Sequence, residues 1–163
     1  MEIERKFLIC RPEETRLRAE SARRIEITQI YLVRGPEGEN RRVRRSREAG
    51  EERLYYTEKL RLSGQTRIER EREIDGAEYA RLLRESDPER RPVEKVRWCV
   101  PYGGHILEID IFPFWQRQAY CEAEMGQEGE TVELPAWIRV LREVTEDERY
   151  SNSSLAREIP PED

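Results

Sequence analysis

Three lysines stand out in this sequence, because arginine fills almost every other cationic position. The chain has 30 lysines and arginines, and only Lys6, Lys59 and Lys95 are lysines. A lysine ammonium is a compact, strongly hydrated point charge, whereas an arginine guanidinium is a planar fork. Each lysine lies in a segment that has the pattern of a β-strand. We therefore expect these positions to serve a contact that a guanidinium cannot make.

Charged residues recur at every second position of the strand-like segments. Alternate side chains of a strand point to the same face, so these residues form charged faces. The cationic positions are Lys6, Arg42, Arg44, Lys59, Lys95 and Arg97. The acidic positions are Glu2 and Glu4; Glu69, Glu71 and Glu73; Glu108 and Asp110; Glu122 and Glu124. Several of these faces lie opposite an apolar one, as Glu108 and Asp110 lie opposite Leu107, Ile109 and Ile111.

Two arrangements would accommodate such faces. In a simple sandwich the apolar faces are buried and the charged faces are solvated. In a closed barrel the charged faces line a lumen, where buried charges cost several kcal/mol each unless they are paired or bind ions. Six cations suit a polyanion with several charged oxygens, and paired carboxylates suit a hard metal such as Mg²⁺ or Mn²⁺. The second arrangement therefore predicts a site for a metal-bound polyphosphate.

Phosphoryl transfer is the chemistry that this combination favours. It requires neutralised phosphate oxygens and an oriented nucleophile, but no covalent nucleophile from the protein. The sequence contains no Ser-His-Asp order, no HExxH segment and no GxxxxGK[ST] loop, so triad hydrolases, zincins and P-loop enzymes have no sequence support. The general base is left unassigned.

The spacing of apolar residues and turns predicts a mainly β (α+β) fold. We expect eight strands, at residues 2–9, 25–33, 41–47, 53–60, 67–74, 93–101, 105–112 and 118–125. Short links at residues 48–51 and 102–104 predict antiparallel hairpins. Helices are expected at residues 12–20 and 75–85 and, from the spacing of Trp137, Ile138 and Leu141, at about 134–158. Residues 159–163 read as a frayed tail.

Composition points to one soluble domain covering residues 1–163. A net charge of −5 argues against nucleic-acid and membrane-surface partners, which need a dominant positive field. Cys10, Cys99 and Cys121 are too far apart for a CxxC motif, and no signal peptide or membrane helix is evident, so we expect reduced thiols and a cytoplasmic location. The sequence leaves the oligomeric state open.

An ordered set of motifs resembles the CYTH, or triphosphate tunnel metalloenzyme, superfamily. Glu2 to Lys6 resembles its ExExK opening. The later matches are Arg42-Val43-Arg44 (R-x-R), Thr57-Glu58-Lys59 (T-x-K), residues 67–74 (alternating glutamates), Glu94-Lys95-Val96-Arg97 (E-K-x-R), Glu108-Ile109-Asp110 (E-x-D) and Glu122-Ala123-Glu124 (E-x-E). Residues 143–156 are similar to the tail of short bacterial inorganic triphosphatases. ExExK alone is weakly specific, but the ordered set covers nearly the whole chain.

The resemblance implies an eight-stranded antiparallel closed β-barrel, a tunnel with a charged lumen and a few covering helices. It implies hydrolysis of a linear triphosphate, most simply inorganic tripolyphosphate, with Mg²⁺ or Mn²⁺. Matching positions give Glu2, Glu4 and Lys6 as catalytic candidates; Lys6, Arg42, Arg44, Lys59, Lys95 and Arg97 as substrate-binding candidates; and Glu2, Glu4, Glu122 and Glu124 as metal ligands, with Glu69, Glu71 or Asp110 as further ones. The alternatives are a class IV adenylate cyclase, a thiamine triphosphatase, or a non-catalytic module that binds polyphosphate or phosphorylated ligands.

Two features remain open at this level. The segment from Phe112 to Trp115 is more aromatic than the polar loop expected there, and would narrow a tunnel mouth, stack on a base or cover the barrel. If the pleat of the third strand is opposite to the one assumed, Arg41 and Arg45 replace Arg42 and Arg44 in the lumen.

Overall fold

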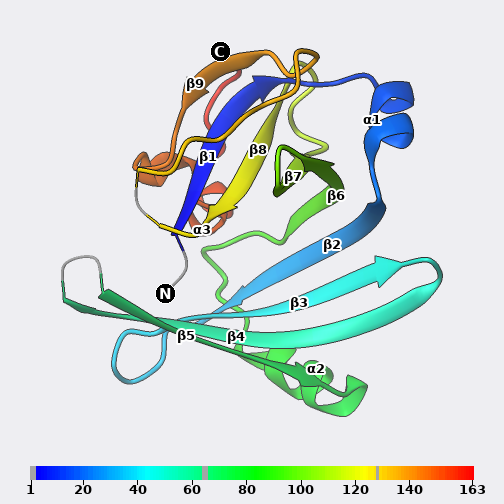
Figure 1. Cartoon of the computed structure of the whole chain (residues 1–163). Coiled ribbons are helices and arrows are strands. Elements are labelled where there is room, and N and C mark those ends of the chain that lie inside the picture. Colours follow the sequence, from blue (N-terminus) through cyan, green and yellow to red (C-terminus); the bar gives the residue numbers. More distant parts are fainter. Residues whose placement is uncertain (1–2, 64–65, 128) are drawn as a thin grey trace. The chain divides into compact units, whose positions relative to one another are not determined.

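The computed structural model describes residues 3–63, 66–127 and 129–163, with side chains outside residues 61–67 (Figure 1). It confirms a mainly β fold with short helices. The elements are β1 (Ile3–Cys10), α1 (Glu14–Glu20), β2 (Arg23–Leu32), β3 (Asn40–Glu48), β4 (Glu51–Ser63), β5 (Thr66–Ile74), α2 (Gly76–Leu82), the 3₁₀ helix η1 (Leu83–Glu85), β6 (Val93–Tyr102), β7 (His105–Ile111), β8 (Gln118–Met125), β9 (Val140–Glu143), the 3₁₀ helix η2 (Glu148–Tyr150) and α3 (Asn152–Leu155).

Both predicted hairpins are present. Ala49 and Gly50 join β3 to β4 with φ values of 51° and 81°, and Gly103 and Gly104 join β6 to β7 with φ values of 59° and 80°. Positive φ at both central residues matches the right-handed twist of the flanking strands, which explains the glycines. These turns fix the register of the two strand pairs.

The prediction of an eight-stranded closed barrel is wrong in two respects. The strands form one nine-stranded sheet in the order β5-β4-β3-β2-β6-β7-β8-β1-β9, and in the described part of the chain this sheet is not closed. The physical reason lies at β1, which pairs with β8 along one edge and with β9 along the other. Both edges of β1 are therefore occupied, and β5 and β9 are the terminal strands.

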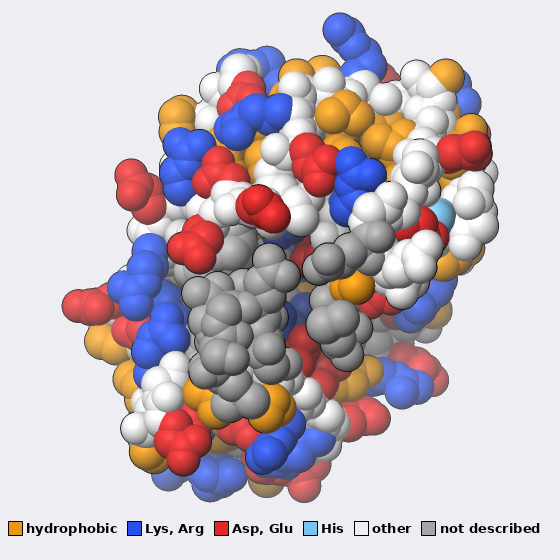
Figure 2. Space-filling view, turned by 60° about the vertical axis from the view of Figure 1, so that its left-hand side comes forward, with side chains coloured by type: hydrophobic (Ala, Val, Ile, Leu, Met, Phe, Trp, Pro, Cys, Tyr) orange, Lys and Arg blue, Asp and Glu red, His pale blue; other side chains and the backbone are white. Residues whose placement is uncertain are grey.

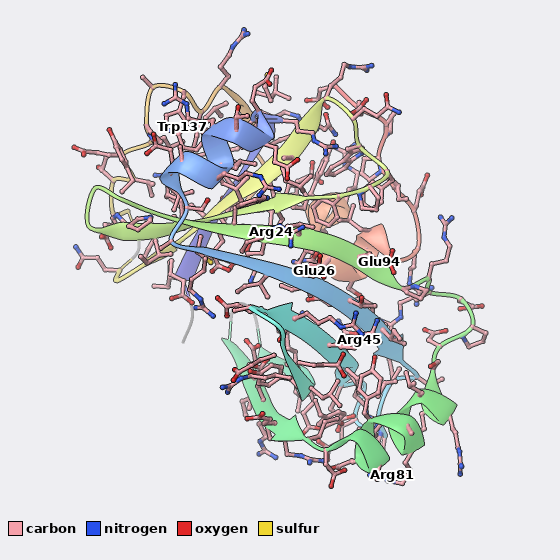
Figure 3. All side chains as sticks on the ribbon, turned by 90° about the vertical axis from the view of Figure 1, so that its right-hand side faces the viewer. Arg24, Glu26, Arg45, Arg81, Glu94 and Trp137 are labelled. Atoms are coloured by element: carbon pink, nitrogen blue, oxygen red, sulfur yellow. The ribbon has the colours of Figure 1, made fainter. Side chains whose placement is uncertain are left out.

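The predicted helix at 134–158 is also wrong. The chain instead forms β9, η2 and α3, and Ile138 packs into a hydrophobic core with Trp137 against it (Figure 3). Pairing of residues 140–143 with β1 satisfies backbone groups that β1 would otherwise leave without partners, and this outweighs a short helical pattern. Among the described residues, no helix is long and apolar enough to span a bilayer.

The end of the chain is bound rather than frayed. The Trp115 indole Nε1 donates a hydrogen bond to the Pro160 carbonyl at 3.0 Å, and the Asp163 amide donates to Gln118 Oε1 at 2.8 Å. Arg142 Nε lies 2.9 Å from Asp163 Oδ2. These contacts tie the last residues to the start of β8 and to β9.

The chain forms two compact units, each with its own core. Unit 1 contains residues 27–94 and 151–159, and unit 2 contains residues 3–26, 95–150 and 160–163. In unit 2 the core includes Leu17 of α1 and the apolar residues of β1, β6, β7 and β8; in unit 1 it includes Leu82 of α2 beside Leu32, Val43 and Ile74. A single domain over the whole chain stays a prediction. Basic and acidic side chains are interspersed on the surface in Figure 2.

Candidate active site

Strand register gathers most of the expected residues of unit 2 on one face of β6, β7, β8 and β1. Arg97 is paired with Asp110, Glu108 with Glu122, and Glu122 with Lys6. Because side chains alternate between faces, this face carries Lys95, Arg97, Glu108, Asp110, Tyr120, Glu122, Glu124, Lys6 and Glu4. We call the residues just named the charged face of unit 2. The opposite face of these strands forms the hydrophobic core of unit 2.

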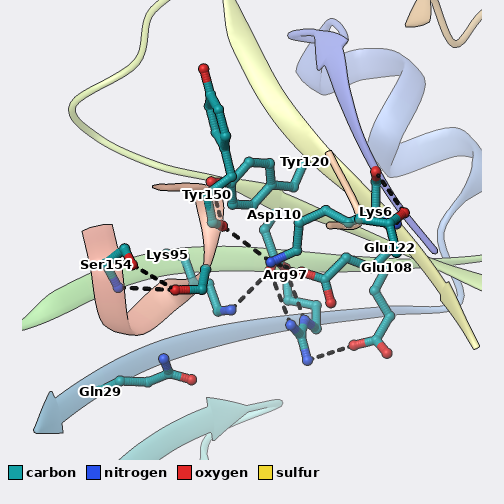
Figure 4. Close-up of polar contacts among 12 residues, drawn as sticks. Lys6, Gln29, Lys95, Arg97, Glu108, Asp110, Tyr120, Glu122, Tyr150 and Ser154 are labelled. Carbon is teal, nitrogen blue, oxygen red and sulfur yellow. Dashed lines mark hydrogen bonds and ion pairs between the residues drawn. The ribbon is translucent and has the colours of Figure 1, made fainter. Parts of the chain in front are cut away.

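Lys95 and Arg97 both bind Asp110, at the centre of this face. Lys95 Nζ lies 2.8 Å from Asp110 Oδ2, and Arg97 places Nε 2.8 Å from Oδ1 and Nη2 3.0 Å from Oδ2 (Figure 4). Burial favours a higher pKa for Asp110, but the two cations outweigh it and hold that pKa below its usual range. Asp110 is therefore ionised, with a cation on each oxygen.

Arg97 reaches from Asp110 to a second carboxylate. Its Nη1 lies 2.5 Å from Glu108 Oε2, and its side chain is 14% exposed, whereas that of Lys95 is 0% exposed. Burial lowers the pKa of Arg97, but Asp110 more than compensates and raises it. Burial also raises the pKa of Glu108, against the opposing effect of Arg97. The guanidinium is thus charged and fixed in orientation, with part of its surface open to solvent.

Lys6 lies at the other side of the same face. Its Nζ is 3.3 Å from Glu122 Oε1 and donates a hydrogen bond to the Tyr150 carbonyl at 3.2 Å. Glu122 Oε1 is buried and, apart from this ion pair, has no hydrogen-bond partner among the described residues. A buried carboxylate oxygen in this condition suits a further cation.

Glu4 and Glu124 are register partners on β1 and β8, and both are exposed. Like charges placed directly opposite each other are unfavourable in a sheet, and a divalent cation relieves that repulsion. Glu2, another catalytic and metal candidate from the sequence, lies outside the described residues. Within the residues that are described, no group of three or more potential metal-binding side chains comes together.

Unit 1 carries a second charged face, on β3, β4 and β5. Arg42 is paired with Thr57, and Thr57 in turn with Glu71. Thr57 Oγ1 donates a hydrogen bond to Glu71 Oε2 at 2.9 Å, and Lys59 Nζ lies 3.8 Å from Glu69 Oε2. We call the set Arg42, Arg44, Thr57, Lys59, Glu69 and Glu71 the charged face of unit 1.

The two arginines of this face differ in their partners. Arg44 donates from Nε and Nη2 to Gln29 Oε1 at 3.0 and 2.6 Å. Arg42 Nε is buried and has no hydrogen-bond partner in the described part of the chain. An unsatisfied guanidinium N–H is costly unless a ligand accepts from it, so Arg42 is the residue of unit 1 that most clearly indicates an anion site.

The pleat of β3 is the one that places Arg42 and Arg44 on the charged face. Arg41 lies on the opposite side, where Nε donates to the Tyr56 hydroxyl at 2.9 Å and Nη1 to Glu85 Oε1 at 3.0 Å. Arg45 follows the same alternation and lies 3.9 Å from Glu52 (Figure 3). Arg41 and Arg45 therefore lie on the face of β3 opposite to Arg42 and Arg44.

The aromatic segment after β7 is buried. Phe112 is 0% and Trp115 1% exposed, and both rings pack edge-to-face on Tyr120. Of the three roles left open by the sequence, covering the sheet fits these two residues. Neither ring has the exposed face that stacking on a base requires.

Several polar residues of the two faces were not found from the sequence. Gln29 lies on the same face of β2 as Ile27 and Tyr31, and all three are buried, so an amide between two apolar residues of one strand face was an available signal. Tyr150 acts through its backbone carbonyl, which no side-chain pattern reveals. Tyr120 was visible in β8 but lacked a distinguishing charge.

The comparisons with known proteins agree on one kind of protein. No family model matches the chain. It is 32% identical over 164 residues to the inorganic triphosphatase of Nitrosomonas europaea, covering 98% of this chain and 99% of that protein. It is 34% identical over 105 residues to the inorganic triphosphatase of Acetivibrio thermocellus, covering 63% of this chain and 65%, or just under two thirds, of that relative.

A solved structure extends this similarity to the fold. The crystal structure of the inorganic triphosphatase NE1496 superimposes with a TM-score of 0.59 at 28% identity, covering 99% of this chain and 97% of that one. The match thus spans the residues of both units.

Proposed function

Because the chain belongs to the CYTH-like family of bacterial inorganic triphosphatases, we propose that it hydrolyses a linear triphosphate, with inorganic tripolyphosphate as its substrate and Mg²⁺ or Mn²⁺ as its metal. The observation that carries the proposal is the charge composition of the unit 2 face. Among the described residues of its four strands, three cations face five carboxylates. Such a face repels a free polyanion, so a divalent metal is needed for triphosphate to bind there.

Lys6 and Arg97 are the proposed phosphate contacts of unit 2. Lys6 is held by Glu122 and the Tyr150 carbonyl, and Arg97 is held by Asp110 and Glu108. Both keep part of their side chain exposed. An arginine fork binds two phosphate oxygens, and a lysine ammonium binds as a point charge. Lys95 is fully buried, so we assign it to holding Asp110, which orients Arg97. In unit 1 the proposed contacts are Arg42, Arg44 and Lys59.

Glu4 and Glu124, with Glu122 beside them, are the proposed metal ligands, and Glu2 keeps the same assignment from its motif. A divalent metal bound there would neutralise phosphate oxygens as the phosphoryl group is transferred. Asp110 does not fit this role, because cations occupy both of its oxygens. Glu69 and Glu71 are engaged by Lys59 and Thr57, and are weaker candidates for the same reason. Glu2, Glu4 and Lys6 remain the proposed catalytic residues.

The other functions have less support. A class IV adenylate cyclase or a thiamine triphosphatase needs a pocket for an organic ring, and Phe112 and Trp115 are too buried to form one by stacking. A non-catalytic binding module would be served by cations alone, whereas this face is rich in carboxylates. We therefore propose a cytoplasmic enzyme that acts on a small molecule and has no nucleic-acid or membrane partner.

A single screen tests it. Phosphate release is measured from tripolyphosphate, pyrophosphate, ATP and thiamine triphosphate with Mg²⁺ and with Mn²⁺, and cyclic AMP is measured in the ATP reactions. We expect the highest kcat/KM with tripolyphosphate and no activity in EDTA. Glu4→Gln should abolish turnover, and Glu14→Gln, an exposed carboxylate on α1, is its matched control. Cyclic AMP without phosphate release, or tight tripolyphosphate binding without turnover, would overturn the proposal.

A further inference from the structure

An aromatic cluster underlies one part of the charged face of unit 2. It consists of Phe112, Trp115, Tyr120 and Tyr150, all at most 2% exposed. The Tyr120 ring contacts each of the other three, with centroids 5.2 to 6.3 Å apart, and the Trp115 ring also contacts all of the others. Since Tyr120 lies on the same face of β8 as Glu122, the cluster meets the charged residues directly.

Lys6 is held by this cluster at two points. Its Nζ lies 4.8 Å from the centroid of the Tyr120 ring, within the range of a cation–π contact. The same Nζ donates to the Tyr150 carbonyl, and the Tyr120 hydroxyl donates to that carbonyl at 2.8 Å. One tyrosine therefore supplies the surface under the ammonium and also fixes the carbonyl that accepts from it (Figure 4).

This double contact restricts the position of the Lys6 ammonium, which a single contact cannot do because a lysine side chain is long and flexible. Glu122 alone would leave the ammonium free to rotate about its partner, at a single ion-pair distance of 3.3 Å. The ring and the carbonyl add two further directions, and three fixed directions define a position.

We propose that Tyr120 is a positioning residue for Lys6, acting through its ring and through the Tyr150 carbonyl, and that this placement governs how Lys6 meets the phosphate. The second half of the inference rests on the proposed function; the first half does not. Lys95 has a related but more distant contact, with Nζ 5.9 Å from the Phe112 ring.

The scarcity of lysine makes a direct test practical. Lysine labelled with ¹³C at Cε gives signals from only Lys6, Lys59 and Lys95, and Lys→Arg variants assign them. The ring current of Tyr120 should place the Lys6 signal upfield. Tyr120→Leu should move that signal downfield and leave Lys59 unchanged. Tyr120→Phe should keep the ring effect with a smaller shift, because only the hydroxyl contact to Tyr150 is lost.

Kinetics give the second readout. Displacement of a catalytic group by about 1 Å can cost on the order of 100-fold in rate, so Tyr120→Leu should lower kcat by at least ~10-fold, and Tyr120→Phe should retain most of it. Phe114→Leu is the matched control, since Phe114 stacks on Phe112 in the same region and, among the described residues, forms no cation–π contact with a lysine. It should leave both the Lys6 signal and kcat near the wild-type values.

The outcomes separate the two proposals. Absence of triphosphate turnover in the wild type would refute the proposed function, while the lysine spectra would still test the positioning. An unchanged Lys6 signal in both Tyr120 variants would overturn the positioning. A shifted signal with unchanged kcat in Tyr120→Leu would overturn its link to catalysis. If Tyr120→Leu does not fold, the comparison of Tyr120→Phe with Phe114→Leu decides.

Discussion

Lys95 and Asp110 form an ion pair with no exposure to solvent on either side chain, at a distance of 2.8 Å from Nζ to Oδ2. Desolvation of two charges is expensive, and close contact with added hydrogen bonds is what compensates for it. Here Arg97 supplies those additional bonds. The pair is thus a fixed anchor for an arginine that is itself only partly buried.

Removal of either member of this pair should be strongly destabilising. Asp110→Asn removes the carboxylate that the buried Lys95 ammonium contacts at 2.8 Å, and Lys95→Met removes one of the two cations that bind Asp110. We expect each single variant to lose about 3–5 kcal/mol of unfolding free energy. Urea unfolding of the two singles and of the double variant measures this. The double variant should lose clearly less than both singles together, whereas strict additivity would mean that the two residues are not coupled.

Acid should weaken the same interaction. The pKa of Asp110 is lowered in the folded protein, whereas an aspartate in an unfolded chain has a pKa of about 3.9. A lowered folded pKa gives stability that is present above the unfolded pKa and is lost as the pH falls through the folded one. The stability difference between wild type and Asp110→Asn should therefore narrow as the pH falls below about 4. A difference that is constant from pH 7 to pH 3 would contradict this.

Arginine should replace the three lysines with unequal success. Lys59 is 41% exposed and lies 3.8 Å from Glu69, so Lys59→Arg should fold with wild-type stability. Lys95→Arg forces a larger group into a fully buried position and should lose about 1–3 kcal/mol. Lys6→Arg should fold but lose at least ~10-fold in kcat, because a planar fork does not fit between Glu122 and the Tyr150 carbonyl. Urea unfolding and tripolyphosphate kinetics distinguish these results, and full activity in all three variants would make the rarity of lysine a coincidence.

Metal binding should depend on the carboxylates that β1 and β8 place opposite each other. Addition of Mn²⁺ should raise the thermal midpoint of the wild type, because a ligand bound only to the folded state stabilises it. Glu124→Gln should reduce that rise and should itself slightly stabilise the metal-free protein, by relieving repulsion from Glu4. Glu20→Gln on α1 serves as the exposed control. An equal Mn²⁺ effect in Glu124→Gln would remove this residue from the metal site.

The buried Arg90 should be important for the stability of unit 1. Its guanidinium binds Asp87, Asn40 and the Leu32 carbonyl at 2.7 to 2.8 Å, and its side chain is 0% exposed. Arg90→Lys keeps the charge, but an ammonium carries all its donors on one nitrogen and cannot reach the three partners that Nε, Nη1 and Nη2 contact separately. We expect a loss of about 2–4 kcal/mol in urea unfolding. Arg91→Lys, at an exposed neighbouring position, should have almost no effect.

The sequence predicted the strands well because their signals are local. Alternating residues around Glu108 and Asp110, and glycines at positions 103 and 104, each specify a conformation within a few residues. The charged faces followed from the same alternation, which also places Arg42 and Arg44 on one face of β3. Local signals of this kind carry no information about distant edges of a sheet.

The failures concern contacts between segments far apart in the chain. Trp137, Ile138 and Leu141 have helical spacing, but residues 140–143 form a strand because they pair with the backbone of β1, about 130 residues earlier in the chain. The same pairing occupies the second edge of β1, which a closed barrel would have needed for pairing with another strand of the sheet. The tail is also held by contacts with a distant segment: the Trp115 indole donates to the Pro160 carbonyl, and the Gln118 side chain accepts from the Asp163 amide. The composition of neither segment indicates these hydrogen bonds.

The short strand β9 also bears on the solubility of the protein. An open row of backbone N–H and C=O groups along β1 would be a template for pairing with another molecule. β9 covers that row and is itself a poor template: it has four residues, its pairing shifts between Leu8 and Ile9, and Arg142 lies within it. Deletion of residues 139–143 should therefore cause self-association in addition to any loss of stability.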